Sequence, residues 1–361
     1  MDSPALIKKL KGNFMCYLVF FIFLLGQLAA NEQHQIVWGQ YLPPQVTAKE
    51  VASALETQES IDLKPIGGGF SGGHLYSLRL NNTDYIVRRT GGVYGPKGAP
   101  QEVAIIKEAS KLGICPKLYY ANSETGLIIM EKIDNILPPE FCPRMLLSTP
   151  ELLEQMAAHL RSLNKLKLDK SCITDRFEMV IFKEAAESID KSPLSAAELK
   201  TVEEVLSWPV DKSQRVITHN DVHCRNLLFD GKKLYIIDWE MAGWGLPGYD
   251  LAGFCNFQVM TREEGIAFYT MYVEREATSE EIAQFMRLRV IHAATCGMQG
   301  FSYSKPDAKD PIAHLRSESI VSTLRNVLLY LDRGKIDLKD NASLQALGIT
   351  WLQFATYLLH Q

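Results

Sequence analysis

The chain has 361 residues, and its 38 Lys and Arg against 42 Asp and Glu give a formal net charge of −4. This balance excludes a nucleic-acid binder that works through a broad basic surface. Hydrophobic residues make up 47% of the chain, which is enough for a large core, so an intrinsically disordered protein is excluded. The seven cysteines form no Cys-x-x-Cys pair, so the sequence indicates neither a zinc knuckle nor a disulfide-stapled scaffold.

The first 31 residues have the pattern of a targeting segment. Three lysines within the first 11 residues precede an uncharged apolar run over 14–25, which is the order of the basic and apolar parts of a signal peptide. The stretch 14–30 is also close to the shortest length of a membrane span. The sequence therefore predicts a signal peptide or a signal anchor over 1–31, with possible membrane association through residues 14–30.

Residues 32–134 read as a small mixed unit, the N-lobe of the predicted fold. Alternating apolar residues predict strands, apolar residues at helical spacing predict helices, and Asn or Gly between them predicts turns. The expected elements, in chain order, are a helix over 47–56 capped by Thr47, antiparallel strands over 75–80 and 85–89 joined by 81–84, a helix over 102–113 that ends at Gly113, and a strand pair over 118–133 that turns near 122–126.

Residues 135–361 are dominated by helical patterns and form the predicted C-lobe. Amphipathic spacing predicts helices over 151–166, 196–206, 279–294 and 317–334. Embedded among them are two short apolar runs, 227–229 and 234–237, joined by Asp230-Gly231, which predicts a hairpin. The predicted fold class is therefore α+β, with a small antiparallel sheet in the first lobe and mostly helices in the larger second lobe.

A glycine cluster, Gly-Gly-Gly-Phe-Ser-Gly-Gly, occupies residues 67–73. The residues after it alternate like a strand, whereas a dinucleotide-binding loop would lead into a helix. A glycine-rich turn between two strands is typical of a flap whose backbone N–H groups close over nucleotide phosphates. The chain contains no G-x-x-x-x-G-K-[ST] motif, which excludes a Walker-type loop. A flexible hairpin without a ligand is the alternative for this cluster.

The strongest pattern for chemistry is His-Asn-Asp-Val-His-Cys-Arg-Asn at 219–226, followed by Asp238 at the end of the predicted hairpin. Phosphoryl transfer needs a carboxylate that orients the attacking hydroxyl, and oxygen ligands that hold Mg²⁺ against the phosphates. Asp221 and Asn226 have the D-x-x-x-x-N spacing of a kinase catalytic loop, and Asp238 stands where the metal-binding Asp is expected. Each residue alone is more typical of a turn, but their order and spacing together predict a kinase site.

These motifs resemble those of the choline/ethanolamine kinases and aminoglycoside phosphotransferases, which have a protein-kinase-like fold. The resemblance rests on residues 219–226, on IIDWEMAGWGLPGYDLAGF at 236–254, on GGGFSGGHLYSL at 67–78 and on YIVR at 85–88. The motif D-W-E-x-A and the later Tyr-Asp-Leu-Ala favour the choline, ethanolamine and thiamine kinase branch of the family. D-W-E in place of D-F-G, with no A-P-E after it, disfavours a protein kinase. The resemblance covers roughly residues 61–256 and implies a bilobal kinase that uses ATP and Mg²⁺.

The resemblance also implies roles for single residues. Asp221 is expected to be the catalytic base, and Asn226 and Asp238 are expected to hold Mg²⁺, with Glu240 as a further carboxylate. Arg88 is expected to contact the α and β phosphates. The implied ATP-binding residues are Gly68, Gly69, Phe70, Ser71, Gly72, Arg88 and its ion-pair partner Glu102, together with Met130, Glu131 and Ile133 of the hinge. Arg89 should point to the opposite face of its strand, His219 is expected to be structural, and the role of His223 stays open.

The substrate site is less defined than the ATP site. Arg225 stands where the family usually has Gly, and its positive charge could bind phosphate or an acidic group of the substrate. Trp239, Trp244 and Tyr249 lie close to the metal loop in sequence, and aromatic rings can form a cage around a quaternary ammonium. Core aromatic residues would have the same spacing, and the three rings are more typical of a core than of a cage. The three aromatic residues and Arg225 are the candidates for substrate contact.

The predicted activity is ATP- and Mg²⁺-dependent transfer of the γ-phosphoryl group to a hydroxyl of a small cationic amino alcohol, with choline or ethanolamine as the first choice. Thiamine or an aminoglycoside as acceptor, and a pseudokinase that binds nucleotide without turnover, stay open as alternatives. No nucleic-acid partner is expected, and no pattern in the sequence predicts an oligomeric state.

The apolar leader conflicts with a need for ATP. Lysines before an apolar segment keep the N-terminus inside and deliver the following domain outside, where ATP is scarce. Three solutions are open: an ATP-bearing compartment reached by secretion, a tether with the kinase on the cytoplasmic side, or a start codon downstream of the leader. A membrane-proximal enzyme is the expectation.

Overall fold

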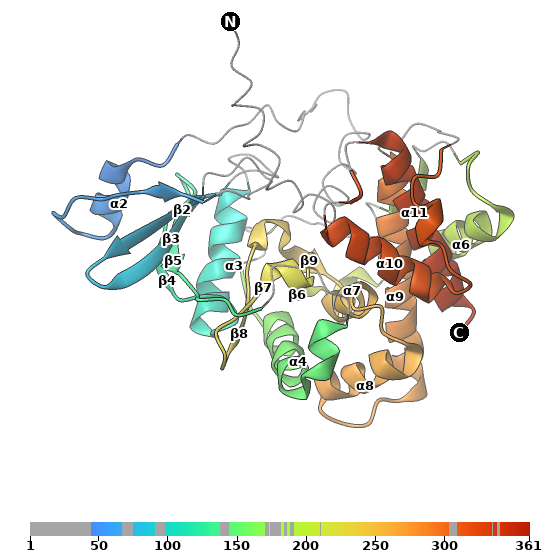
Figure 1. The fold of residues 1–361 in the computed structure, drawn as a ribbon. Helices are drawn as coiled ribbons and strands as arrows, with labels where there is room; N and C mark the ends of the chain where they lie inside the picture. The colour runs from blue at the N-terminus through green and yellow to red at the C-terminus, as the bar shows by residue number, and fades with distance from the viewer. Residues whose placement is uncertain are drawn as a thin grey trace, which may run out of the picture.

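The computed structural model describes residues 45–66, 75–90, 98–137, 144–169, 173, 182–183, 186–187, 191–209, 211–302, 309–333, 335–337 and 340–361. These residues form a small sheet-containing lobe, blue and teal in Figure 1, beside a larger helical lobe that ends in orange and red. This arrangement confirms the predicted α+β class. No helix within the described ranges is long and apolar enough to cross a membrane. The predicted leader over 1–31 and its apolar run lie outside the described residues.

The sheet of the small lobe has five antiparallel strands in the order β1-β2-β3-β5-β4. They are β1 (Lys64–Pro65), β2 (Leu75–Leu80), β3 (Thr83–Arg89), β4 (Leu118–Ala121) and β5 (Leu127–Glu131). Both predicted strand pairs are confirmed. The first turn is shorter than expected: Asn81 and Asn82 adopt φ of 49° and 61°, and Thr83 already pairs with Leu80. Asn tolerates this left-handed conformation, which a two-residue hairpin turn requires.

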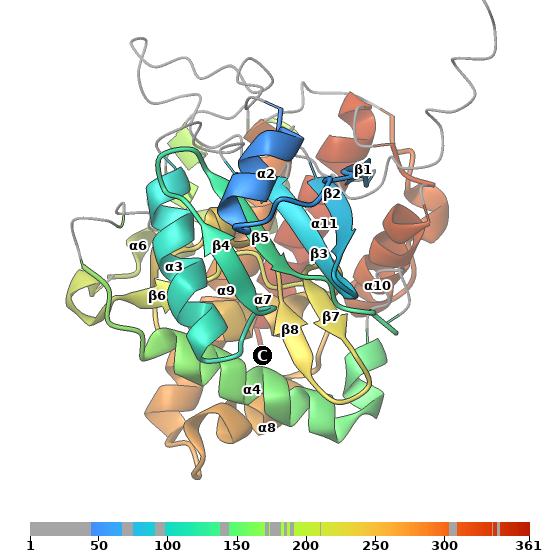
Figure 2. The ribbon, with the colours of Figure 1, turned by 90° about the vertical axis from the view of Figure 1, so that its left-hand side faces the viewer.

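One helix lies on each side of this sheet, α2 (Ala48–Ala54) and α3 (Ala99–Lys111) (Figures 1 and 2). The two faces follow from the alternation of β5. Leu127 and Ile129 pack in a small cluster with Val51 of α2, whereas Ile128 and Met130 belong to the main core together with one face of α3. Successive strand residues point to opposite faces, so β5 is buried on both.

Both helices of the small lobe are predicted from sequence, and both are confirmed. Thr47 caps α2 and forms a capping box with Glu50. α3 begins at Ala99, three residues before the predicted start, because Pro100 fits the first turn of a helix. It is followed by Gly113, whose φ of 68° provides the predicted helix stop.

In the described part of the helical lobe, the four predicted helices are present together with three more. Its helices are α4 (Pro150–Asn164), α6 (Ala196–Ser207), α7 (Tyr249–Phe257), α8 (Arg262–Val273), α9 (Ser279–Ser302), α10 (Ile320–Asp332) and α11 (Asn341–Leu359), with 3₁₀ turns η3 (Met145–Ser148), η5 (Lys212–Gln214), η6 (Cys224–Asn226), η7 (Trp239–Met241) and η8 (Ala313–Leu315). α9 runs past its predicted end at residue 294. Gly300 lies within this longer α9. A Cβ at this position would come within 2.9 Å of Gly348 Cα in α11, so the glycine permits the two helices to cross closely.

Short strands between the lobes carry the candidate active site (Figure 1). The predicted hairpin is confirmed as β7 (Leu227–Phe229) and β8 (Leu234–Ile236), and β6 (Val216–Thr218) pairs with β9 (Gly243–Gly245). In the hairpin turn, the Asp230 carboxylate accepts the N–H groups of Lys232 and Lys233, each at 2.8 Å. The predicted lobe boundary at 134/135 falls in the segment between β5 and α4, where Ile136 N donates to Phe229 O at 2.9 Å.

Candidate active site

Arg88 of β3 joins the two lobes at the site. Its guanidinium forms an ion pair with Glu102 of α3, and a second nitrogen lies 3.6 Å from Asp238 Oδ1. The Glu102 side chain is 2% exposed, and the Thr90 hydroxyl donates to its other oxygen. The predicted ion pair between Arg88 and Glu102 is therefore confirmed. Its use in binding ATP stays a prediction.

Arg89, the next residue of β3, faces away from the site as expected. Its guanidinium donates to both carboxylate oxygens of Glu50, at 2.8 and 2.9 Å, and to Thr125 O at 2.8 Å. Glu50 belongs to α2, so this contact fixes α2 against the strand that carries Arg88. The alternation of the strand thus gives the two adjacent arginines separate roles.

α3 is also tied to the helical lobe, which fixes the position of Glu102. Gln101 Nε2 donates to Ala242 O at 2.6 Å, and Ile236 N donates to Ile114 O at 2.8 Å. The first bond joins α3 to the loop after η7, and the second joins the residues that follow α3 to β8. The acidic partner of Arg88 is thereby held by both lobes.

Asp221 lies in the loop between β6 and β7 and is 1% exposed. Asn226 Nδ2 donates to Asp221 Oδ2 and to the backbone oxygen of Asp221, each at 2.9 Å. Burial alone would raise the pKa of Asp221, but the His223 and His219 rings and the Asn226 amide outweigh it and hold this pKa below its ordinary value. The carboxylate is therefore ionised at neutral pH and available to orient a hydroxyl. Asn226, which donates through Nδ2, keeps its amide oxygen as a possible metal ligand.

The loop around Asp221 depends on Asp250, to which the sequence analysis assigned no role. The Asp250 carboxylate accepts the backbone N–H groups of His219 at 2.7 Å and Asn220 at 2.8 Å. Asn220 has φ of 65°, and its side chain donates to Met241 O at 3.0 Å. Burial raises the pKa of Asp250 to about 6. The signal that could have found it is a lone carboxylate within the otherwise uncharged helix α7.

His219 has a structural role, as the sequence analysis expects. Its Nε2 lies 3.0 Å from Ile237 O, and its Nδ1 lies 3.3 Å from the backbone nitrogen of Asp221. These partners require Nε2 to donate and Nδ1 to accept, which defines a neutral ring. Burial lowers the pKa of His219 to about 4. The ring also packs edge-on against Trp239 at 4.7 Å between centroids.

This burial predicts that acid destabilises the fold. The pKa of His219 is about 4 in the folded chain, against an ordinary value of 6.5, so between these values only the unfolded chain takes up the proton. Stability from this group is complete above about pH 6.5 and falls as the pH drops toward 4, by about 1.4 kcal/mol per pH unit.

The measurement is urea unfolding of the wild type and His219→Gln at pH 7.5, 6 and 5. We expect the stability advantage of the wild type to shrink as the pH falls. Two other buried histidines of the site region, His223 and His292, are present in both proteins, so their contributions cancel from the comparison. A constant difference across the three pH values would contradict the assignment.

Asp238 is the carboxylate that is expected to bind the metal. It has φ of 66° and precedes η7, where Glu240 is buried. Burial, followed by the negative charge of Asp221, raises the pKa of Asp238, although Arg88 acts in the opposite direction. A cation between the two carboxylates would relieve their repulsion, and carboxylate and amide oxygens are ligands that Mg²⁺ accepts. The residues present therefore fit Mg²⁺.

Asp238 and Asn226 are the two residues that would hold a metal at this site. Among the described residues, no three His, Cys, Asp or Glu side chains gather closely enough to hold an ion. Mg²⁺ is commonly bound through one or two carboxylates together with phosphate oxygens of the substrate, which agrees with a site made of Asp238 and Asn226. The role of Glu240 stays a prediction.

Two of the four candidate substrate residues are not placed for substrate contact. Trp239 and Tyr249 are each 1% exposed; the Trp239 indole donates to Ile236 O at 3.0 Å, and the Tyr249 ring packs 5.4 Å from the His292 ring. Both are core residues, which is the alternative that the sequence favours for these rings, so neither is available to a substrate cage. Trp244 of β9 and Arg225 of η6 are half-buried, and their roles stay predictions.

The predicted nucleotide hinge follows β5. Met130 is largely buried in the main core, and the Glu131 N–H donates to Lys117 O at 2.8 Å. Ile133 lies two residues beyond the strand and is half-buried. Adenine binding by this segment stays a prediction. The predicted glycine flap, including Gly68, Gly69, Phe70, Ser71 and Gly72, lies outside the described residues.

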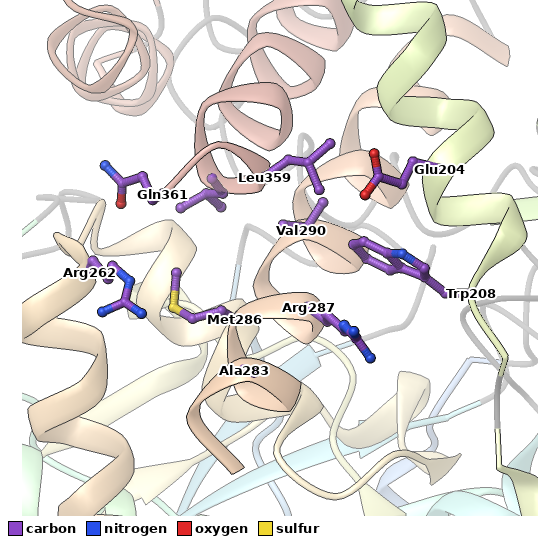
Figure 3. A pocket seen from close by; sticks show the side chains of 10 residues that line it. Glu204, Trp208, Arg262, Ala283, Met286, Arg287, Val290, Leu359 and Gln361 are labelled. Atoms are coloured by element: carbon purple, nitrogen blue, oxygen red, sulfur yellow. The ribbon is translucent and has the colours of Figure 1, made fainter. Parts of the chain in front are cut away.

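A hollow of about 270 Å³ lies elsewhere in the helical lobe (Figure 3). It is lined by Trp208 just after α6, by Arg262 of α8, by Met286 and its neighbours on α9, and by Leu359 of α11. None of the residues discussed above lines it. The candidate site in the loops between the lobes is therefore separate from this hollow.

Comparison with known proteins agrees with this geometry. The model of the family described as "APH: Phosphotransferase enzyme family" matches residues 62–287. No curated protein matches the sequence. The chain is similar to a choline/ethanolamine kinase family protein from Mesorhizobium loti, with 16% identity over 83% of this chain and 98% of that chain and a TM-score of 0.51.

Two antibiotic phosphotransferases are similar to the same degree. A spectinomycin phosphotransferase solved with ADP and spectinomycin has 15% identity over 87% of this chain and 100% of that chain, with a TM-score of 0.52. A macrolide 2'-phosphotransferase from Brachybacterium faecium has 14% identity over 78% and 95%, with a TM-score of 0.53. At these identities the likeness shows the fold alone. The family match covers more than half of the chain, which therefore belongs to the phosphotransferase enzyme family.

Proposed function

We propose that the protein is a small-molecule kinase that transfers the γ-phosphoryl group of ATP to a substrate hydroxyl. The observation that carries this proposal is the assembly of Asp221, Asn226, Asp238, Arg88 and Glu102 in one site between the lobes. Phosphoryl transfer depends mainly on positioning and on stabilising charge, and these residues supply both.

Each residue has a defined part in this reaction. Asp221 orients the acceptor hydroxyl and takes its proton. Arg88, held by Glu102, grips the phosphates with a planar and permanently charged guanidinium. Asn226 and Asp238 hold Mg²⁺, which neutralises charge on the phosphate oxygens. The spectinomycin phosphotransferase of the same fold, solved with ADP, supports ATP as the donor.

A small cationic amino alcohol is the proposed acceptor, with choline or ethanolamine first. Two observations support this class of acceptor. They are the D-W-E-x-A motif at 238–242 and the choline/ethanolamine kinase family protein among the similar structures. Burial of Trp239 and Tyr249 removes two rings from a cage around a quaternary ammonium, which favours ethanolamine over choline. Thiamine and aminoglycosides are the alternatives, since antibiotic phosphotransferases share the fold.

A panel of acceptors tests the proposal. The full chain is incubated with Mg-ATP and with choline, ethanolamine, thiamine, spectinomycin or a macrolide, and ADP release above the acceptor-free rate is measured. We expect turnover with ethanolamine or choline, and its loss when Mg²⁺ is chelated. ATP binding without turnover on any acceptor would contradict the kinase and favour a nucleotide-binding module.

Arg88→Lys tests the proposed phosphate grip. Lys keeps the charge, but a single ammonium cannot contact Glu102, Asp238 and phosphate in the fork geometry of Arg. We expect kcat/KM for ATP to fall about 10- to 100-fold, the loss of one charge-assisted contact. Arg79→Lys is the matched control, because Arg79 lies on neighbouring β2 and is largely exposed. Equal losses in the two variants would contradict the role.

We also propose that the enzyme works close to a membrane, held there by residues 14–30. The basic and apolar order of the leader supports this proposal. Fractionation of the native protein, followed by N-terminal sequencing, tests it. A soluble protein whose sequence starts after residue 30 would contradict it.

A further inference from the structure

Asn220 is a buried residue of the catalytic loop, residues 219–226, and it directly precedes the proposed base Asp221. It is 4% exposed. Its backbone N–H donates to Asp250 Oδ1 at 2.8 Å, and its side-chain Nδ2 donates to Met241 O at 3.0 Å. Met241 is the last residue of η7. The Asn220 side chain therefore links the catalytic loop to a second segment of the site.

This second segment is the metal loop, residues 237–242, which carries the proposed metal ligand Asp238. At its start, the Ile237 N–H donates to the backbone oxygen of Asn226 at 2.9 Å. Near its end, Met241 O accepts the side-chain amide described above. The metal loop is thus bonded to the catalytic loop on both sides of its carboxylate.

The next carbonyl of the metal loop is held by the small lobe. Gln101 of α3 donates to Ala242 O at 2.6 Å, and it precedes Glu102, the partner of Arg88. Two adjacent carbonyls of the metal loop therefore bond to two different parts of the molecule. Without the Asn220 bond, the end of the metal loop would keep its bond to α3 but lose this bond to the catalytic loop.

Position 220 requires both an unusual backbone conformation and a side-chain donor. Its φ of 65° lies in the left-handed region, which Gly, Asn and Asp adopt more readily than other residues. Its partner is a carbonyl oxygen, which can only accept, so the side chain must donate. Gly has no side chain, and an ionised Asp has no donor. Asn meets both requirements.

We propose that Asn220 is a positioning residue that fixes the metal loop relative to Asp221 through its amide bond to Met241 O. In the proposed reaction Asp221 orients the acceptor and Asp238 holds Mg²⁺, so the rate depends on how the two loops are fixed to each other. A misplacement of about 1 Å can cost about 10²-fold in rate. The inference rests on the proposed kinase function, because it concerns the geometry of this reaction.

Amide hydrogen exchange tests the link without turnover. Asn220→Gly permits the same backbone conformation and removes the amide, and the full chain is compared with the wild type in the absence of nucleotide. We expect exchange over 237–245 to be about 2- to 10-fold faster in the variant, which is the contribution of one hydrogen bond. Asn82→Gly is the matched control, because Asn82 has φ of 61° in the exposed turn between β2 and β3.

Two results of this experiment would overturn the proposal. One is exchange over 237–245 that is the same in the wild type and in Asn220→Gly. The other is an increase spread evenly over the whole chain, because a residue that only stabilises the fold would give this result.

Asn220→Gly is expected to stay folded. In the part of the chain that the structure describes, Asn220 Oδ1 is buried without a hydrogen-bond partner, so the substitution removes an unpaired acceptor together with the donor. We expect a Tm within about 3 °C of the wild type. Asn220→Ala also removes the amide but strains the left-handed backbone. It should show the same exchange over 237–245 with a lower Tm, which separates the bond from the backbone conformation.

Kinetics with an acceptor that turns over tests the consequence. We expect kcat of Asn220→Gly to fall about 10- to 100-fold and the Mg²⁺ concentration for half the maximal rate to rise, while KM for the acceptor changes less than about twofold. An unchanged kcat would overturn the positioning role. If the wild type turned over none of the acceptors, the proposed function would fail, while hydrogen exchange would still decide whether Asn220 holds the metal loop.

Discussion

Asp221→Asn is expected to lower kcat by about 10²- to 10⁴-fold, the usual contribution of a positioned general base. Asn has the shape of Asp and can still accept the bond that Asn226 donates at 2.9 Å. It cannot take a proton from the acceptor hydroxyl, and it removes the negative charge that orients this hydroxyl. Arg88, Glu102 and the side chains of the two proposed metal ligands are unchanged, so binding of Mg-ATP should stay within about twofold of the wild type.

The measurement is acceptor-dependent ADP release together with calorimetric titration of Mg-ATP. Asp62→Asn is the control, because Asp62 is an exposed carboxylate of the small lobe. Wild-type turnover in Asp221→Asn would remove Asp221 from its role. Loss of ATP binding in this variant would place Asp221 in nucleotide binding instead.

Several parts of this site are predictable from local sequence because they depend on short-range geometry. The alternation of β3 sends Arg88 and Arg89 to opposite faces, and the structure places one at Glu102 and the other at Glu50. The spacing of Asp221 and Asn226 likewise places both in a single loop, where their side chains meet. Such features need only neighbouring residues and a regular backbone.

Other parts depend on packing between distant segments, which local patterns do not report. Trp239 and Tyr249 follow the motif closely in sequence, yet their rings turn into the core. α11 is buried on most of its surface, so it lacks the polar face by which an amphipathic helix is detected. Small residues allow α9 and α11 to approach closely. In the sequence alone, the same residues are also typical of the end of a helix.

Asp250 is the clearest case, because its role consists entirely of contacts to a loop 30 residues away. We expect the free energy of unfolding to be lower in Asp250→Asn than in the wild type, and lower still in Asp250→Ala. Ala leaves the N–H groups of His219 and Asn220 without their acceptors inside the protein, and each buried unsatisfied donor costs about 1–3 kcal/mol. Asn keeps one acceptor oxygen, so Asp250→Asn should lose less stability than Asp250→Ala.

Urea unfolding at pH 7.5 measures the series, with kcat as the second readout. The pH is chosen because burial raises the pKa of Asp250 to about 6, so at pH 7.5 the wild-type carboxylate is ionised. Asp310→Ala is the matched control, since Asp310 is partly exposed and pairs with Arg316 at the surface, where an ion pair contributes about 1 kcal/mol or less. Because Asp250 holds the backbone next to Asp221, kcat in Asp250→Ala should fall even under conditions where the variant stays folded. Full activity in a folded Asp250→Ala would show that the catalytic loop keeps its shape without this carboxylate.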